Sequence, residues 1–171
     1  SNPLRSRFGV IARLDYYKLN DIEAIIKRSS RILGCQIEPE AIKIIAAASR
    51  FTPRIANRLL KRSRDYAQVY GQGIISKEIS QKTLSSLEID NLGLEPHDRR
   101  LLQVLIKKFN GGPVGLSTLA ASLNEEKDTL EEVYEPYLMN LGFLQRTSQG
   151  RIATAAAYDY LKIPKGQNSL L

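Results

Sequence analysis

Residues 52–62 read TPRIANRLLKR, and this stretch decides how the first half of the chain folds. Thr52 and Pro53 are typical of a helix start, because threonine can cap free backbone N–H groups and proline in the first turn loses no hydrogen bond. The helix that follows is strongly basic, and its cations are Arg54, Arg58, Lys61, Arg62 and Arg64. The helix dipole disfavours a cation in the first turn, so Arg54 predicts a negatively charged partner at this helix end.

Two plainer interpretations of these cations stay open. Arg54 could extend into solvent or pair with a carboxylate of its own domain. Arg58 and Arg62 follow four and eight residues later, so they share one helix face with Arg54. That face could simply be solvated, which is the interpretation that we favour for Arg62.

This helix, which should run to about Tyr70, is the third of four helices predicted within residues 18–88. Asn20 opens the first, with Glu23 three residues later as a capping box. Pro39 starts the second, and Ser76 caps the fourth, which covers residues 77–87. Four short helices enclose no pocket of their own, so we interpret the bundle as a lid or an adaptor.

The residues before this bundle predict that the sequence belongs to a longer protein. Residues 8–14 have the composition of a β-strand, but no partner strand is evident nearby. Because a lone strand needs neighbours to pair with, we expect the rest of its sheet to lie upstream.

Residues 89–171 show the element order of a winged helix. The pattern predicts a helix, a short extended stretch, a brief helix capped by Ser117, a longer helix, a hairpin and a last helix. Their expected ranges are 97–109, 114–116, 118–123, 125–141, 143–147 with 151–154, and 154–161. This order is the winged variant of the helix-turn-helix motif.

The helix that usually enters the major groove is acidic here. Residues 125–135 hold six carboxylates and one lysine, which DNA phosphates would repel, so groove reading by this helix is disfavoured. The hairpin differs, because Arg146 and Arg151 flank its tip and we expect no acidic residue nearby. Raising salt from ~50 to ~200 mM would weaken two phosphate contacts roughly tenfold, so several copies would have to act on one duplex. A solvated turn and a platform for protein contacts are the alternatives for this hairpin.

The charge distribution supports two domains with different tasks. The net charge is +7, but residues 1–88 hold 16 Lys and Arg against 8 Asp and Glu, whereas residues 89–171 hold 9 against 10. The anionic partner is therefore expected at the first half. One cysteine and one histidine exclude an internal disulfide and a typical zinc site, and they fit a reducing cytosol.

Several classes of activity are excluded by what the sequence lacks. The glycine-rich run GGPVGLST contains no lysine and is not a phosphate-binding loop, and the single His97, expected on a helix surface or at a cap, cannot support a Ser-His-Asp arrangement. This chain alone should therefore not hydrolyse nucleotide. No apolar run approaches the ~20 residues of a membrane span, and no signal peptide is evident.

Five motifs together carry a resemblance to a known family. PLRSRFGVIARLDYY, FTPRIANRLLKRSRDYA, FNGGPVGL, EPYLMNLGFLQRT and GRIATAAAYDYL occur in unbroken order over residues 3–163. They resemble the C-terminal half of the RuvB family, the bacterial Holliday-junction branch-migration motors. The resemblance implies a mainly α fold: residues 1–17 as the tail and hinge of a missing AAA+ ATPase domain, 18–88 as a four-helix AAA+ lid, and 89–171 as a winged-helix domain with a small β-hairpin.

The resemblance also implies roles for single residues. Arg54 matches the second sensor arginine, which approaches the nucleotide phosphates from the lid, and Tyr17 matches a residue on the base side of the nucleotide. Arg7 is similar to a nucleotide-contacting arginine, and Arg5 to the finger that enters the neighbouring subunit's site. Arg146 and Arg151 match wing arginines that follow the DNA backbone. Phe51 stands where glycine is common, which could shift the lid hinge but leaves Arg54 in register.

The function that the resemblance implies is ATP-driven branch migration of Holliday junctions by a cytoplasmic homohexamer. ATP and Mg²⁺ would be its cofactors, and duplex DNA, RuvA and RuvC its partners. Two alternatives remain: a free-standing winged-helix regulator, which the acidic helix and the unpaired strand disfavour, and a fragment of another AAA+ replication or clamp-loading protein, which the wing arginines and the GGPVGL turn disfavour.

Overall fold

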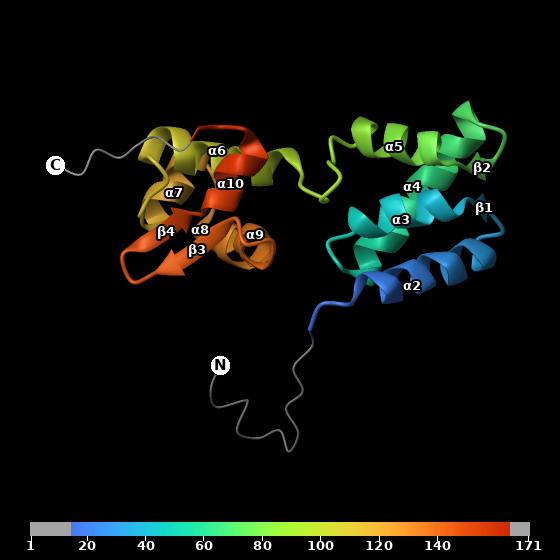
Figure 1. Ribbon diagram of the computed structural model, residues 1–171, viewed down its shortest axis with the longest axis horizontal. Helices are drawn as coiled ribbons and strands as arrows, with labels where there is room; N and C mark the ends of the chain where they lie inside the picture. Colours follow the sequence, from blue (N-terminus) through green and yellow to red (C-terminus); the bar gives the residue numbers. More distant parts are fainter. Residues whose placement is uncertain (1–14, 165–171) are drawn as a thin grey trace, which may run out of the picture. The chain divides into compact units, whose positions relative to one another are not determined.

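The computed structural model describes residues 15–164, which divide into two compact units (Figure 1). The first unit ends at Ser86 and the second begins at Leu87. Among the described residues no helix is both long and apolar enough to cross a membrane.

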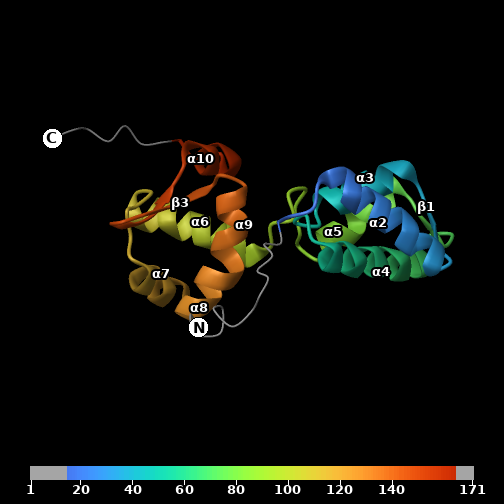
Figure 2. The same ribbon diagram turned by 90° about the horizontal axis from the view of Figure 1, so that it is seen from below.

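The first unit is a helical bundle with one short parallel strand pair. Its described elements are α2 (Leu19–Ile32), β1 (Gln36–Ile37), α3 (Pro39–Ala47), α4 (Pro53–Tyr70), β2 (Ile74–Ile75) and α5 (Lys77–Ser86). α4 contacts α2, α3 and α5, and Figure 2 shows the four helices from below. Its fully buried aliphatic side chains include Ile22, Ile26, Ile45, Leu59 and Leu60. Each contributes about 1.5–3 kcal/mol by leaving water, which is enough to hold helices whose opposite faces are charged.

The predicted helix starts of this unit are correct at some caps and wrong at one. Pro39 and Pro53 each occupy the first turn of their helix, and the backbone N–H of Ile79 donates to Ser76 Oγ at 3.3 Å, so these expectations are confirmed. The Asn20 capping box is wrong, because the carbonyl of Lys18 already accepts the N–H of Ile22 at 3.1 Å. The helix therefore begins before Asn20 can act as its cap.

Thr52 occupies the N-cap position of α4 but caps in a different way from the one expected. Its Oγ1 donates to the carbonyl oxygen of Arg50 at 3.0 Å instead of accepting a helix N–H. The hydroxyl thus fixes the turn that leads into α4. The far end agrees with the prediction, since α4 stops at Tyr70 and Gly71 follows as the C-cap.

The second unit contains the helices and the hairpin of a winged helix. Its elements are α6 (Pro96–Phe109), α7 (Leu116–Leu123), α8 (Lys127–Thr129), η1 (Leu130–Tyr134), α9 (Glu135–Asn140), β3 (Leu144–Thr147), β4 (Gly150–Ala153) and α10 (Ala155–Leu161). The core contains Leu101, Leu102, Leu105, Leu119, Leu130 and Leu138, all fully buried. α7 starts earlier than predicted, with Gly115 at its N-cap and not Ser117, because Leu119 donates to the Gly115 carbonyl at 3.0 Å.

The helix predicted over residues 125–141 is continuous in direction but not in geometry. It consists of α8, the π-helical turn η1 and α9. The cause is Pro136 in the first turn of α9, because proline has no N–H to donate and its ring collides with the carbonyl four residues earlier. A π-helical turn accommodates this break and changes which residues share a face downstream.

The hairpin is antiparallel, and its strand β4 is also tied to the loop before α7. In the register of β3 and β4, Arg146 lies opposite Arg151. Of the extended stretch predicted at residues 114–116, only Val114 forms a bridge, exchanging backbone hydrogen bonds with Arg151 at 2.8 and 3.0 Å. Gly112 has a φ of 93°, and a Cβ there would collide with the carbonyl of Arg151. This close approach requires glycine.

Candidate functional sites

The first candidate site is the end of the first unit where α4 begins. Arg54 lies in the first turn of α4, and its side chain is exposed. Within residues 15–164 its guanidinium has no hydrogen bond or ion pair. The alternative in which Arg54 pairs with a carboxylate of its own bundle is therefore not what the structure shows. An exposed cation at a helix N-terminus, where free N–H groups also point outward, can receive an anion.

Tyr17 reaches the same end of the bundle through the backbone. Its N–H donates to the carbonyl oxygen of Phe51 at 3.3 Å, three residues before Arg54, and about half of its side chain is exposed (49%). Phe51 has a φ of 53°, in the left-handed region that glycine adopts without strain. This conformation would suit glycine.

The remaining cations of α4 include one that is paired within the helix and three that are exposed like Arg54. Arg64 donates to Asp65 at 2.8 Å, so it is paired within its own helix. Arg58, Lys61 and Arg62 are exposed, and for Arg62 this fits the solvated face that we expected. The predicted basic face is therefore present on the surface of α4.

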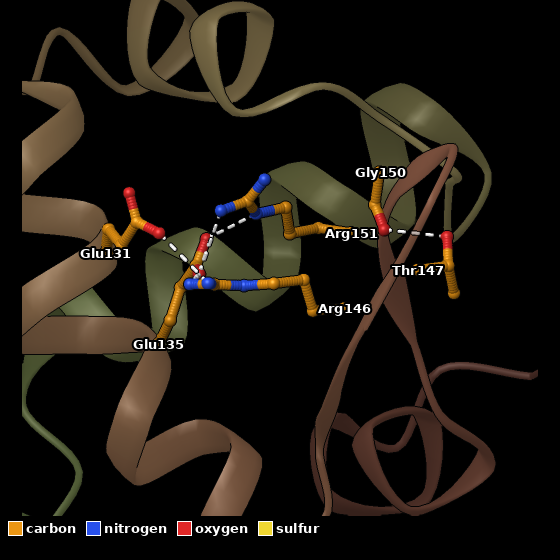
Figure 3. Close-up of polar contacts among 6 residues, drawn as sticks. All are labelled: Glu131, Glu135, Arg146, Thr147, Gly150 and Arg151. Carbon is orange, nitrogen blue, oxygen red and sulfur yellow. Dashed lines mark hydrogen bonds and ion pairs between the residues drawn. The ribbon is translucent and has the colours of Figure 1, made fainter.

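The second candidate site is the hairpin, where both arginines contact a buried carboxylate. Glu135, the first residue of α9, has no solvent exposure. Arg151 donates to it twice, from Nε to Oε1 at 2.6 Å and from Nη2 to Oε2 at 3.1 Å, and Arg146 donates from Nη2 to Oε2 at 2.6 Å (Figure 3). Glu135 separates two like charges that lie directly opposite each other across the strands and would otherwise repel.

Arg146 has a second, outer partner. Its Nη1 lies 2.9 Å from Glu131 Oε1, and both side chains are about four-tenths exposed (41% and 44%). The hydrogen bond to Glu135, with a smaller contribution from Glu131, raises the pKa of Arg146 above its ordinary value, so this guanidinium stays charged. Arg151 is much less accessible, with 12% of its side chain exposed.

The expectation that no acidic residue lies near the wing arginines is wrong. The fold places Glu131 and Glu135 against these arginines, although the glutamates are 11 to 16 positions away from them in the sequence. Neither glutamate was singled out in the sequence except as part of the acidic segment. Glu135 lies three residues before the buried Leu138, so it shares a buried face, which was the one available signal.

The acidic segment is on the surface, as its composition indicates. Glu126, Asp128, Glu131 and Glu132 are exposed, so phosphates approaching this helix would be repelled. His97 lies in the first turn of α6, exposed, with its ring stacked on Tyr134 at a centroid distance of 6.1 Å. This confirms its surface position. Within residues 15–164 no group of three or more His, Cys, Asp or Glu side chains could hold a metal ion.

Arg5 and Arg7, the two other predicted nucleotide-site residues, lie outside the described residues. Of the predicted set, the structure therefore brings Arg146 and Arg151 together on the hairpin, and it ties the backbone of Tyr17 to Phe51, three residues before Arg54.

Comparison with known proteins gives both units the same family. Residues 17–90 match the RuvB AAA lid domain, and residues 91–162 match the RuvB C-terminal winged helix domain. The chain belongs to the RuvB family.

Similar proteins extend over almost the whole chain. It is 55% identical to a Holliday junction branch migration complex subunit RuvB of Koribacter versatilis, over 99% of this chain and 48% of that protein. Its identity to the subunit of Chloroflexus aurantiacus is 54%, over 99% of this chain and 49% of that protein. The chain thus spans about half the length of the curated relatives that it matches.

A solved structure has the same fold. The Thermotoga maritima RuvB Holliday junction branch migration motor superposes with a TM-score of 0.92 at 51% identity, covering 96% of this chain and 55% of that one. The predicted fold class, a mainly α lid followed by a winged helix with a small hairpin, is confirmed.

Proposed function

We propose that this chain is the lid and DNA-gripping half of an ATP-driven motor that moves Holliday junctions in recombination and repair. The observation that carries this proposal is Arg54, which is exposed and has no partner within residues 15–164, in a chain whose two units match the RuvB AAA lid and C-terminal winged helix domains. A cation without a partner in its own bundle fits a ligand that is bound mainly by another domain.

The residues present fit a nucleoside triphosphate. The guanidinium of Arg54 and the N–H groups of the first turn of α4 offer positive charge to phosphates, and the half-exposed ring of Tyr17 offers an apolar surface to a base. ATP would supply the free energy of hydrolysis, with Mg²⁺ held outside residues 15–164. Arg54 would then sense the nucleotide, because losing a phosphate removes the charge that holds this end of the lid.

The resemblance assigns two further arginines to the same reaction. Arg7 would contact the nucleotide, and Arg5 would enter the site of the neighbouring subunit of a homohexamer. An arginine finger that stabilises charge on the transferred phosphoryl group is typically worth about 10³–10⁵ in rate. On this proposal the 171-residue chain alone does not turn over ATP.

The wing would hold duplex DNA by its backbone. Arg146 is the more accessible cation, and Arg151 keeps Nη1 free of the contacts to Glu135, so both can face phosphates while Glu135 holds them. Non-specific phosphate contacts suit a motor that must move along any sequence. The exposed carboxylates of the acidic segment keep that helix out of the groove.

The complete motor would be cytoplasmic and would act with the junction-binding partner RuvA and the resolvase RuvC. In it, lid movement driven by ATP turnover would displace the wings and the DNA that they hold. These assignments come from the family to which the chain belongs.

The test is Arg54→Ala in a full-length RuvB that contains this chain, assayed for branch migration of a synthetic four-way junction and for ATP hydrolysis. We expect migration to be lost. Arg62→Ala is the matched control, because it removes the same charge from the same helix at an exposed position, and it should migrate normally. Normal migration by the Arg54 variant would refute the sensing role.

A further inference from the structure

The guanidinium of Arg146 is divided between two carboxylates of very different kinds. Nη2 donates to the buried Glu135 at 2.6 Å, while Nη1 lies 2.9 Å from the exposed Glu131. Figure 3 shows the two glutamates approaching Arg146 from the helix side. The inner contact is part of the core of the second unit, and the outer contact is at the surface.

The inner contact fixes where Arg146 points. Glu135 has no exposure and accepts from Arg151 as well, so its position is set by two cations and by the core around it. Removing one partner of such a buried set leaves an uncompensated charge, so it persists when the surface changes. Arg146 therefore keeps its orientation whatever binds its outer N–H groups.

The outer contact is of the kind that exchanges readily. Exposed ion pairs are screened and contribute little, changing an equilibrium by about fivefold at most. A phosphate offers a guanidinium the same type of oxygen pair as a carboxylate does, and it can take the same N–H groups. Glu131 thus occupies the place on Arg146 that a DNA phosphate needs.

We propose that Glu131 is an internal competitor of DNA for Arg146. In the free wing its carboxylate binds the outer side of the guanidinium, and a backbone phosphate displaces it when duplex DNA binds, while Glu135 keeps the inner side. The proposal rests on the DNA-contacting role of Arg146 given above, and it adds a residue that limits how tightly that contact holds.

The charges explain why such a competitor would serve a moving grip. Two guanidinium groups face two carboxylates, so the free wing has no excess positive charge at this point. To bind a phosphate, Arg146 must break its ion pair with Glu131, and the freed carboxylate then lies close to the phosphate. Repulsion between these two negative groups favours release of the DNA. A motor that advances along a backbone must give up every phosphate that it holds.

The experiment compares Glu131→Gln with Glu132→Gln for binding to a short fluorescent duplex, followed by anisotropy at ~50 mM salt. Both substitutions remove one exposed negative charge from the same helical turn, and Glu132 has no hydrogen bond or ion pair in the described part of the chain. We expect Glu131→Gln to tighten binding about two- to fivefold more than Glu132→Gln does. In an Arg146→Gln background the two variants should bind equally.

The outcomes separate this inference from the proposed function. If Arg146→Gln weakens duplex binding but Glu131→Gln and Glu132→Gln bind equally, the competitor role is refuted and the DNA contact stands. If Arg146→Gln leaves binding unchanged, the contact itself is refuted and the competitor role falls with it. An advantage of Glu131→Gln that persists in the Arg146→Gln background would also overturn the inference, since Glu131 would then repel DNA without acting on Arg146.

Discussion

The two candidate sites use the same side chain in opposite ways. Arg54 is exposed and has no partner within residues 15–164. Arg146 and Arg151, in contrast, contact carboxylates of their own unit, and the carboxylate that they share is fully buried. The wing arginines are ion-paired within the second unit, so a ligand can bind their charge only by displacing a carboxylate. Arg54 makes no ion pair within residues 15–164, so we expect its charge to contribute little to the stability of its bundle.

This difference predicts where each arginine matters. A group that completes a buried ion cluster supports folding, and removing it costs stability. A group without partners affects only what binds to it. Measuring the free energy of unfolding and the binding of ligand separately at both sites therefore tests each half of this comparison.

The largest expected effect is at the centre of the wing cluster. Glu135→Gln removes the buried carboxylate that contacts both opposed arginines, one of which is nearly buried, and should lower the free energy of unfolding by about 3–5 kcal/mol. Urea unfolding of the chain, followed by circular dichroism, measures this change.

The control for that prediction is Glu132→Gln, an exposed acid on the same helical segment, which should change stability by no more than about 0.5 kcal/mol. Equal stability of both variants would mean that Glu135 does not hold the wing, and the contrast between the two sites would disappear.

A smaller effect is expected on the salt dependence of duplex binding. Arg146→Gln should reduce the slope of log affinity against log salt by about 0.9 per copy, because one phosphate contact is lost. Arg100→Gln removes an exposed cation of α6 in the same unit and is the control. A variant lacking both wing arginines should also carry Glu135→Gln, since a buried carboxylate without cations would unfold the unit for another reason. An unchanged slope in these variants would show that the wing does not contact phosphate.

The helices of the first unit could be predicted because their signals are local, whereas the parallel pair of β1 and β2 was not predicted. Pro39, Pro53, Ser76 and Gly71 each determine a helix end through their own backbone or side chain, and the structure has all of them in place. The Asn20 cap failed because the helix begins with Lys18 at its N-cap, a residue whose side chain makes no capping hydrogen bond and which therefore gave no signal in the sequence.

Apart from the spacing of Glu135 to Leu138, nothing in the sequence predicted the wing cluster, because it depends on a helix distortion next to Glu135. Pro136 produces the π-helical turn, and with that turn Glu135 joins the buried face of Leu130, five residues earlier. A regular helix with 3.6 residues per turn would separate the two by well over a right angle. The run of carboxylates in the sequence therefore predicted an acidic helix, but it did not show which carboxylate of residues 125–135 is buried.

A hydrogen bond between two side chains of the second unit gives a prediction of a smaller effect. The hydroxyl of Tyr160 donates to Asp90, and Arg99 donates to the carbonyl oxygens of Leu94 and Glu88, which fixes the start of this unit on its own helices. Tyr160→Phe should lower stability by about 1 kcal/mol near neutral pH, because Asp90 loses a hydrogen bond.

The same pair predicts a pH dependence. Burial, and then the hydrogen bond to Asp90, raise the pKa of Tyr160 above its ordinary value. A tyrosine in the unfolded chain loses its proton near pH ~10, so the stability from this group is complete below that pH and is lost as the pH rises further. Urea unfolding at about pH 9 and about pH 11 should show a shallower decline for Tyr160→Phe than for the unaltered chain. Equal declines would mean that another tyrosine, such as Tyr134, whose pKa is also raised, accounts for the change.

The smallest expected effect is at Arg54, and it is the most informative. Because its guanidinium has no partner within residues 15–164, Arg54→Ala should change the free energy of unfolding by less than about 0.5 kcal/mol, and slight stabilisation is reasonable, since a cation leaves the positive end of α4. Urea unfolding of the 171-residue chain beside the Arg62→Ala variant measures it. A loss of 2 kcal/mol or more, on the scale of about 1–3 kcal/mol for a broken buried contact, would show that Arg54 serves its own bundle after all. With stability unchanged, loss of branch migration in the full-length Arg54 variant would support the proposed sensing role, because unfolding of the lid could not explain the loss.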